Sequence, residues 1–593
     1  MLRAVLLPFR AAQGRRAVLG LALSSVLLVA GCGDGGKEIT GTTTQPAPLG
    51  EAKQGGTLEQ LGSTDVDFVD PGRTYFTPGY QLAYAIGRGL YGFKPGSSGP
   101  VPDLAEGAPE IGADGMSVTV KLRSGVKFAP PVNREVAAAD VKYAFERAFS
   151  ANVGGPYAAT YFSAIKGAPA QPTKGVKPIV GIAAPDARTL VFTLTRPEAA
   201  QVAAALVMPI TIPVPEEYAK RFDAKNPSTY NTHVAASGPY MVSSDAEGNL
   251  TGYKPGRSIT LVRNPNWDRS TDYKPALLDR IKWKTNGGDA SLDAQQVLRG
   301  EGMSLDTDPP APELKNAVTK RPGQFGSVSA GGYRYFPLNT QVKPFDDPNV
   351  RKAVLAVFDR DAARKARGGE VIGEIATHFL PPDFPGHEEG GGADGPDVDF
   401  LKNPRGDQAL AEKYMKAAGY PSGKYTGSEK LLVVGATSNP VKAQAQVAKA
   451  QLEKLGLRVE LRLVPADAVY TEFCQVPAKK VAVCAGAAWG KDFEDPQSML
   501  EPTFKGANIQ PGGNNNNIAQ LDDPKINAAM EKAAVLSGQE RLDAYGAIDK
   551  MIVESAAAVP FVWDKTTIIW SKDVGGQVNP YYLTLDFTFT SRK

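Results

Sequence analysis

The sequence predicts a mixed α/β protein built from more than one domain. An apolar run at 431–435, a segment of helical spacing at 443–455 and a strictly alternating segment at 458–464 follow one another. Strand, helix and strand in this order are typical of a βαβ unit, whose helix crosses over between two parallel strands. The chain has 593 residues, and single hydrophobic cores stop growing well below that length, so we expect two to four domains.

Composition is that of an ordinary folded protein. Hydrophobic residues make up 42% and charged residues 22% of the chain, which is enough apolar material for a sizeable core. The formal net charge is +3, and four arginines within the first 31 residues more than account for it. The rest of the chain is therefore close to neutral, and we expect no nucleic-acid partner.

The first half alternates short strands with helices. Residues 57–61 are expected to form the first strand, and 117–122 alternate apolar and polar residues as a half-buried strand does. Helical spacing appears at 83–90 and again at 139–149, where one face is apolar and Asp140 stands near the N-terminus.

The second half adds more helices and ends in a strand. Residues 526–535 and 542–552 have helical patterns, and 559–563 are expected to form a closing strand. The apolar run 481–485 reads as a buried strand that opens into small residues and then into a loop with one aromatic and several acidic side chains. Such a loop could hold an extended ligand with a cationic end, although solvated surface acids would look the same.

The N-terminus has the features of a targeting segment. Residues 1–31 combine a basic start with an apolar stretch at 17–30, which is too short for a stable membrane span, and they run into Cys32. This ending resembles a bacterial lipobox, so we expect a lipoprotein signal peptide over 1–31 and lipidation of Cys32. The alternative is an uncleaved anchor with an incidental cysteine. Residues 32–54, rich in Gly, Thr and Pro, are expected to be a flexible tether.

The two remaining cysteines and the histidines bear on metal binding. In an exported protein, Cys474 and Cys484 are expected to form a disulfide. His233, His378 and His387 are scattered along the sequence, and no metal-ligand spacing is present. We therefore expect neither a metal nor a cofactor.

Motifs of catalysis are missing from the sequence. No Gly-x-Ser-x-Gly elbow is present. The segment 486–491 has too few residues between its glycines, and no Ser or Thr after its lysine, to be a phosphate loop. We expect that the protein is not an enzyme. A secreted lipoprotein hydrolase of a novel type is the alternative.

Several ordered motifs carry a resemblance to a known family. They are 102–106, 121–128 (KLRSGVKF), 139–147 (ADVKYAFER), 237–240 (SGPY), 263–267 (RNPNW), 338–340 (LNT) and 344–353 (PFDDPNVRKA). Together they resemble the extracellular solute-binding proteins of family 5, the receptors of ATP-driven peptide importers of the oligopeptide, dipeptide and nickel types. The likeness spans about 55–561. Residues 386–395, rich in glycine, depart from it and are expected to be a local insertion or mobile loop.

The resemblance implies a two-lobed fold of the periplasmic-binding-protein type (type II), with an extra subdomain on the first lobe. Lobe I would take 55–90, 230–334 and 560–593, and its subdomain 91–229. Lobe II would take 335–559. Ligand would bind between the lobes, and hinge closure would be the expected motion.

The resemblance also implies site residues. Peptide-binding members hold the ligand's α-amino group with an aspartate in a Trp-x-x-Asp pattern, and Trp489 and Asp492 fit it. The backbone of Ala485, Gly486 and Ala487 would pair with an extended ligand, and Tyr335 could pack on its side chains. The alternative is that Asp492 only orders its own turn, or that Lys491 neutralises it.

The function implied is that of the substrate-binding lipoprotein of an ABC transporter. It would capture extracellular peptides and deliver them to a membrane permease, as a monomer held at the outer face of the cell membrane by lipid on Cys32. The same fold and importer role for a metal chelate, a sugar or an opine is the first alternative. A lipoprotein that senses ligand for a signalling partner is another.

Overall fold

The computed structural model describes residues 53–593 except 63–64, 96, 98, 286–288 and 307. The predicted signal peptide, Cys32 and all but the last two residues of the predicted tether lie outside the described residues. Those that are described belong to one compact unit, 42–593, and form six β-sheets.

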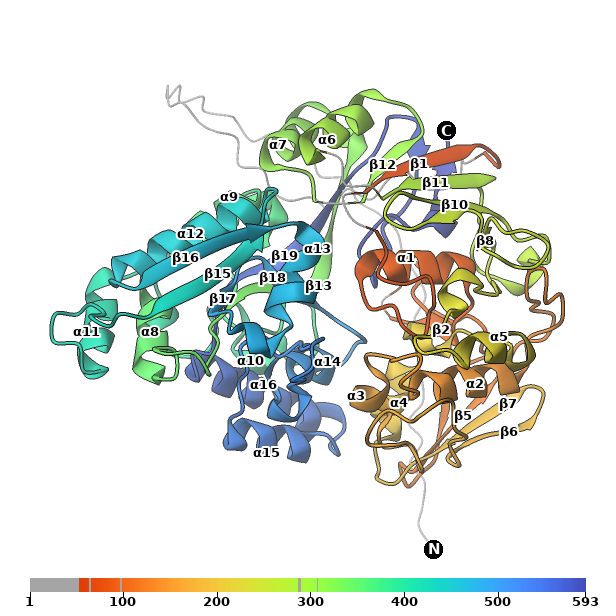
Figure 1. The fold of residues 1–593 in the computed structure, drawn as a ribbon, viewed down its shortest axis with the longest axis horizontal. Helices are drawn as coiled ribbons and strands as arrows, with labels where there is room; N and C mark the ends of the chain where they lie inside the picture. Colours follow the sequence, from red (N-terminus) through yellow and green to blue (C-terminus); the bar gives the residue numbers. More distant parts are fainter. Residues whose placement is uncertain (1–52, 63–64, 96, 98, 286–288, 307) are drawn as a thin grey trace, which may run out of the picture. The chain divides into compact units, whose positions relative to one another are not determined.

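The largest sheet contains the predicted first strand. Its strands run in the order β12-β1-β11-β10-β8, and β9 pairs with β10 (Figure 1). Their bounds are Thr57–Leu61 (β1), Tyr240–Val242 (β8), Tyr253–Lys254 (β9), Ser258–Arg263 (β10), Arg280–Lys284 (β11) and Met303–Leu305 (β12). β1 pairs in parallel with both β11 and β12, so the start of the described chain lies inside the sheet.

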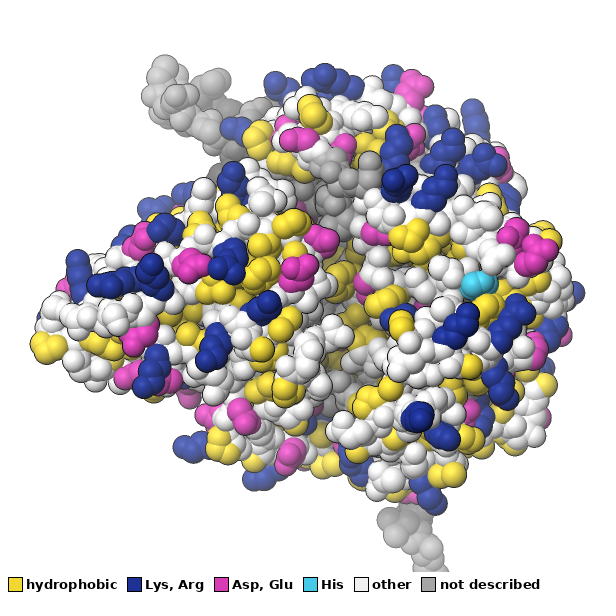
Figure 2. Space-filling model, viewed as in Figure 1, with side chains coloured by type: hydrophobic (Ala, Val, Ile, Leu, Met, Phe, Trp, Pro, Cys, Tyr) yellow, Lys and Arg dark blue, Asp and Glu magenta, His cyan; other side chains and the backbone are white. Residues whose placement is uncertain are grey.

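One face of this sheet is basic. β11 alternates, with Ile281 and Trp283 buried and Arg280, Lys282 and Lys284 exposed. Figure 2 shows Lys and Arg side chains gathered at the upper right, over the region of β1, β10 and β11, whereas the two signs of charge are mixed over most of the viewed face.

A second, antiparallel sheet of order β4-β5-β7-β6 holds the predicted strand 117–122. Its strands are Glu110–Ile111 (β4), Ser117–Lys121 (β5), Ile182–Asp186 (β6) and Thr189–Thr193 (β7). The predicted helix forms as α2 (Ala138–Ala148), and its side chains Val141 and Phe145 share a core with β5 and β7. Asp140 accepts a hydrogen bond from the Ala137 backbone N–H, 2.8 Å away, which fixes the helix start.

Two long antiparallel strands, β13 (Phe325–Pro337) and β19 (Ala558–Ile569), form the centre of a third sheet. Its order is β14-β19-β13-β18, with β14 at Gly373–Glu374 and β18 at Ala487–Gly490. The predicted closing strand is thus correct but too short, and β13 was not predicted. Among the described strands, β18 pairs only with β13.

The predicted βαβ unit is confirmed. β15 (Lys430–Ala436) pairs in parallel with β16 (Arg458–Val464), and α12 (Val441–Lys454) lies along them (Figure 1). β17 pairs in parallel with the other edge of β15. The prediction of one strand over 481–485 is wrong in extent, because β17 covers only Val483–Cys484 and the chain then turns at Gly486 into β18.

The other helices surround these sheets. They are α1 (Thr77–Ile86), α3 (Ala158–Phe162), α4 (Ala199–Ala205), α5 (Glu216–Asp223), α6 (Ala290–Arg299), α7 (Ala311–Lys320), α8 (Pro348–Val357), α9 (Arg360–Arg367), α10 (His387–Gly390), α11 (Gln408–Ala417), α13 (Ala466–Ala468), α14 (Pro496–Phe504), α15 (Pro524–Ala533) and α16 (Gly538–Glu554). Small two-stranded sheets pair β2 (Tyr91–Gly92) with β3 (Val101–Pro102) and β20 (Val574–Gly575) with β21 (Ser591–Arg592). The helix predicted over 83–90 begins six residues earlier and ends before Gly87.

The structure bears on two expectations about 378–395. The glycine-rich segment is folded, since it forms α10, and a Cβ on Gly546 of α16 would lie 2.4 Å from the Cβ of Glu389. His378 and His387 are scattered in sequence but stack in space, with ring centroids 4.9 Å apart, and both are buried. Nδ1 of His378 lies 2.8 Å from the Asp549 carboxylate, so this pair belongs to the core.

Candidate ligand-binding site

Asp492 lies two residues beyond the end of β18, with only 6% of its surface exposed. Its carboxylate accepts hydrogen bonds from the hydroxyls of Tyr75, at 2.8 Å, and of Tyr161. A third hydroxyl, from Tyr581, donates to the Asp492 backbone carbonyl at 2.7 Å. Three segments that are distant in the sequence therefore meet at this one residue.

Burial raises the pKa of the Asp492 carboxyl to about 7, and the hydrogen bonds from Tyr161 and Tyr75 oppose the rise. The neighbouring charges are already paired: Lys491 with Glu494, and Asp495 with Arg541 at 2.8 Å. Within the described part of the chain, no Lys, Arg or His nitrogen lies within salt-bridge distance of Asp492. A ligand ammonium would supply the missing partner.

The surroundings of Asp492 are aromatic. The centroid of the Tyr75 ring lies 5.4 Å from that of the Tyr157 ring and 6.0 Å from that of the Trp489 ring. The Tyr581 ring lies 5.8 Å from that of Tyr80. The Tyr80 hydroxyl is buried and has no hydrogen-bond partner among the described residues. Ring faces of this kind attract cations and pack on apolar or aromatic groups.

The outer edge of β18 is the second part of the site. β18 pairs antiparallel with β13, Ala487 opposite Tyr335 and Trp489 opposite Tyr333. Beyond the strand, the Lys491 N–H donates to the Gly331 carbonyl at 3.3 Å. Along antiparallel strands, residues whose N–H and C=O groups bond to the partner strand alternate with residues whose groups point away from it. Because Lys491 bonds to β13, Trp489 and Ala487 also face it. The N–H and C=O groups of Ala488 and Gly490 therefore point away from β13. These groups are placed to pair with a further extended chain.

The residues predicted around β18 have different surroundings. The Trp489 indole N–H donates to the Ser498 carbonyl at 2.8 Å, and its ring meets Tyr75 edge to face. The Ala485 N–H donates to the Val434 carbonyl at 2.8 Å, so it is used inside the protein. The Gly486 carbonyl accepts a hydrogen bond from the hydroxyl of Tyr470, and Ala487 pairs with β13.

Tyr335 is not brought to Asp492. It is 1% exposed, and its ring packs against Tyr333, Phe379 and Phe504. Its place in β13 turns the side chain into the hydrophobic core, so the structure gives it a packing role instead of the predicted contact with ligand.

The sequence analysis missed Tyr75, Tyr161 and Tyr581. Tyr75 precedes α1, Tyr161 belongs to α3, and Tyr581 lies near the C-terminus. Tyr75 and Tyr161 stand 417 and 331 residues from Asp492 in the sequence, so no local pattern joins them to it. The one available signal is the density of tyrosines at 75–91 and 581–582.

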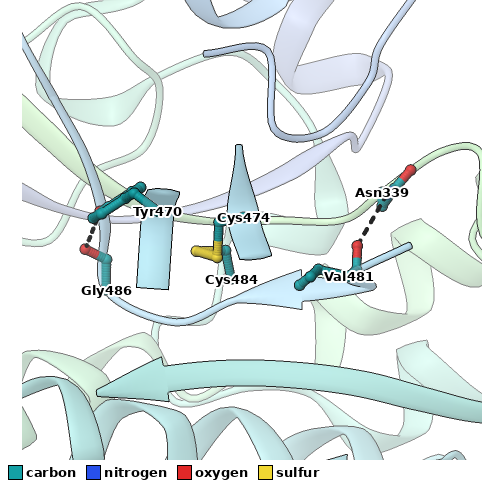
Figure 3. The surroundings of a disulfide bond; sticks show 6 residues. All are labelled: Asn339, Tyr470, Cys474, Val481, Cys484 and Gly486. Atoms are coloured by element: carbon teal, nitrogen blue, oxygen red, sulfur yellow. Dashed lines mark hydrogen bonds between the residues drawn. A yellow bond between two sulfur atoms is a disulfide. The ribbon is translucent and has the colours of Figure 1, made fainter. Parts of the chain in front are cut away.

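The disulfide adjoins the same strand. Cys474 and Cys484 are joined, with their Cα atoms 5.9 Å apart (Figure 3). The bond links the helical turn Val469–Cys474 to β17, immediately before the chain turns into β18.

Two negative findings apply to the described residues. They contain no helix long and apolar enough to cross a membrane. They also contain no group of three or more His, Cys, Asp or Glu side chains arranged to hold a metal ion.

Comparison with known proteins identifies the class. The family model described as "Bacterial extracellular solute-binding proteins, family 5 Middle" matches residues 99–511. That is more than half of the chain, which therefore belongs to the family 5 extracellular solute-binding proteins. It is a non-catalytic solute-binding protein of an ABC importer and acts outside the cytoplasm.

Individual relatives are named for different ligands. The chain is 26% identical over 523 residues to Di/tripeptide-binding protein 2 of Pseudomonas aeruginosa, covering 86% of this chain and 89% of that protein. It is 25% identical over 484 residues to Heme-binding protein A of Haemophilus influenzae, covering 79% and 80%.

Solved structures establish the fold. The chain is similar to Clavulanic acid biosynthesis oligopeptide binding protein 2, with a TM-score of 0.75, 26% identity and coverage of 93% of this chain and 97% of that one. It is also similar in fold to the periplasmic binding protein DppA of Helicobacter pylori, with a TM-score of 0.74, 23% identity and coverage of 91% and 99%. The mixed α/β periplasmic-binding-protein fold predicted from the sequence is confirmed.

Proposed function

We propose that the solute is a peptide with a free amino terminus, whose ammonium group pairs with Asp492. The observation that carries the proposal is a buried carboxyl group with two hydroxyl donors and, among the described residues, no cation in salt-bridge distance. It lies next to a strand edge with which no other described strand pairs. A ligand ammonium would stabilise the ionised form of this carboxyl and balance its charge, while the hydroxyls of Tyr75 and Tyr161 continue to donate hydrogen bonds to it. Removing one partner of a buried ion pair typically costs about 3–5 kcal/mol.

The strand edge explains how the site could accept peptides with different side chains. A peptide laid along β18 would bond through its backbone to the outward groups of Ala488 and Gly490, as strands added to a sheet edge do. Backbone bonds give affinity without reading sequence. Trp489 and the tyrosines around Asp492 would then pack on whichever side chains the ligand brings.

The test is binding measured by calorimetry with peptides that differ only at the amino terminus. A free-amine tripeptide should bind, and its N-acetylated form should bind at least tenfold more weakly, about 1.4 kcal/mol. Asp492→Asn should weaken binding of the free-amine peptide by at least the same factor and leave binding of the acetylated peptide nearly unchanged. Asp397→Asn, which alters an exposed carboxylate paired only with Lys402, is the matched control. Equal binding of the two peptides would refute the amine anchor.

A non-peptide solute is the second candidate. The relative named for heme binding and the aromatic surroundings of Asp492 favour it, and a structural neighbour is in complex with agropinic acid. The family role would be the same. Native mass spectrometry of the purified protein separates the two: a ladder of peptide masses supports the peptide proposal, and one defined non-peptide mass supports the second.

Two lobes joined by a hinge are also proposed. β13 and β19 pass through the two predicted lobe boundaries, at 334–335 and 559–560. Their register shifts between Ser329 and Tyr333, where Gly331 takes φ of 53°. An interrupted pairing of this kind bends a strand, which supports hinge motion there. Small-angle scattering should show a smaller radius of gyration when ligand is added.

Membrane attachment through Cys32 completes the proposal. The sequence supports it by a basic start, an apolar stretch and a cysteine in lipobox order. Acyl chains contribute about 0.8 kcal/mol per buried methylene, enough in combination for stable anchoring. Cys32→Ser should move the protein from the membrane fraction to the medium. A variant that stays in the membrane fraction would contradict lipid anchoring at Cys32.

A further inference from the structure

Tyr470 lies beside the outer edge of β18. It belongs to the helical turn Val469–Cys474, and its side chain is half-buried. Its hydroxyl donates to the Gly486 carbonyl at 3.2 Å, as the dashed line at the left of Figure 3 shows. Burial raises the pKa of Tyr470, and the charge of Arg334 and the backbone of Ala488 oppose the rise.

The group that Tyr470 engages lies on the outer edge of the strand. The Gly486 C=O stands just before Ala487, on the side of β18 away from β13 by the alternation set at Lys491. A further strand would donate a backbone N–H to this carbonyl. The Tyr470 hydroxyl donates to it instead and occupies that place.

The position of Tyr470 is held from several sides. Four residues later the same turn is joined to β17 by the disulfide between Cys474 and Cys484. Gly486 takes φ of 79°, and a Cβ there would lie 2.9 Å from methyl groups of Val441. The turn that presents the carbonyl to Tyr470 is therefore fixed by close packing.

We propose that Tyr470 ends the pairing edge of β18 and so limits the ligand to short peptides. This inference rests on the proposed peptide function. Between Asp492 and Tyr470 the edge offers the outward N–H and C=O groups of Gly490 and Ala488. An extended chain covers about 3.3 Å per residue, so three residues span about 10 Å. A peptide anchored by its amine at Asp492 reaches Tyr470 after about three residues.

The test is a series of alanine peptides of two, three, five and seven residues, all with free amines, measured by calorimetry. The unaltered protein should bind tri-alanine at least tenfold more tightly than penta-alanine. Tyr470→Ala should reduce the ratio of the two affinities to within about threefold, because penta-alanine should bind more tightly to this variant. Tyr470→Phe, which removes only the hydroxyl, should reduce it in part. Tyr414→Phe removes the hydroxyl of another tyrosine, bonded to Asp399, and should leave the ratio unchanged.

Two results would overturn the inference in distinguishable ways. If the unaltered protein binds penta-alanine and hepta-alanine as tightly as tri-alanine, the length limit is refuted and the peptide function stands. If it binds no member of the series, and a free-amine peptide library gives no thermal stabilisation, the peptide function itself fails and the length limit fails with it. Even if Tyr470→Ala does not fold, the series on the unaltered protein tests the length limit and Tyr470→Phe tests the part that the hydroxyl plays in it; an unchanged ratio in Tyr470→Phe would refute that part.

Discussion

Asp492 is a carboxyl group whose charge depends on what it binds. In the structure its pKa stands at about 7 because it is buried, and no cation among the described residues lies within salt-bridge distance to oppose the rise. A ligand ammonium would reverse that condition by stabilising the ionised form. Binding is therefore expected to be coupled to loss of a proton from the protein.

The first prediction is a pH dependence of peptide affinity. Below about pH 7 the carboxyl of the free protein is protonated and must ionise before it pairs with an ammonium. The association constant for tri-alanine should then rise about tenfold per pH unit from pH 5 to 7 and level off above it. Calorimetry in buffers of different ionisation enthalpy should also detect proton release at pH 6. An affinity that is flat between pH 5 and 8 would contradict the assignment.

The second prediction concerns stability without ligand. The folded carboxyl holds its proton up to about pH 7, whereas the unfolded one loses it near 3.8. The unfolded state therefore binds fewer protons between these values, and the free energy of unfolding falls as pH rises through this window. Asn does not titrate, so Asp492→Asn removes this pH-dependent loss of stability. The variant should have a higher Tm than the unaltered protein at pH 8 and nearly the same Tm at pH 4. A lower Tm for the variant at pH 8 would show that the ionised carboxylate is stabilising.

The third prediction concerns the two hydroxyls that donate to Asp492. Their hydrogen bonds favour the ionised carboxylate. Replacing both Tyr75 and Tyr161 by Phe should move the midpoint of the pH dependence above 7 and weaken tri-alanine binding at pH 7. Tyr218→Phe serves as the control at a tyrosine packed on Phe222. An unshifted midpoint would mean that the hydroxyls do not act on the carboxyl.

At the scale of an element, β18 depends on neighbours on both sides of it. It has only four residues, too few to form a stable strand alone, and β13 fixes its register. Its start is fixed by the disulfide before Gly486 and by the hydroxyl of Tyr470. The strand edge that would receive a ligand is thus ordered before any ligand arrives, which lowers the entropy cost of binding.

The fourth prediction tests the disulfide as a support for this edge. Cys474→Ser with Cys484→Ser should weaken tri-alanine binding severalfold while most of the fold persists, because β15, α12 and β16 contain neither cysteine and pair with one another directly. Hydrogen exchange should increase at Gly486–Gly490 and remain unchanged in β1 and β11. Unchanged exchange in β18 would show that β13 alone holds the strand.

At the scale of the whole molecule, the site joins segments from across the sequence. Asp492 is bonded by tyrosines from before α1, from α3 and from the C-terminal segment. The fifth prediction is that tri-alanine slows hydrogen exchange in all three segments and in β18 together, and that Asp492→Asn abolishes the joint effect. Protection confined to β18 would show that ligand binding is not transmitted to the other segments.

The sequence predicted the elements whose pattern is local. β1, β16 and α2 have regular spacing over five or more residues, and their bounds were predicted within one residue. β13 was missed because Gly326, Gly331 and Gly332 interrupt its apolar pattern, and long-range pairing with β19 compensates for them. Pairing also sets the bounds of β18, since its pattern alone does not separate it from β17.

The candidate site could be predicted only in part. Asp492 was found because its Trp-x-x-Asp pattern lies within four residues. Its protonation could not be inferred, because burial and the lack of a cation depend on how Lys491, Glu494, Asp495 and Arg541 pair in three dimensions. Tyr335 was misplaced for a related reason, since the pattern does not show which face of β13 meets the core.

The Tyr581 hydroxyl on the Asp492 backbone has a consequence for how the protein is made. Tyr581 follows Asp492 by 89 residues, whereas the strands of the largest sheet, from β1 to β12, all precede Asp492. Because translation proceeds from the N-terminus, all strands of this sheet are synthesised before Asp492 and Tyr581. The hydrogen bond between Tyr581 and Asp492 therefore forms late, and the ligand site matures after the sheet that supports it.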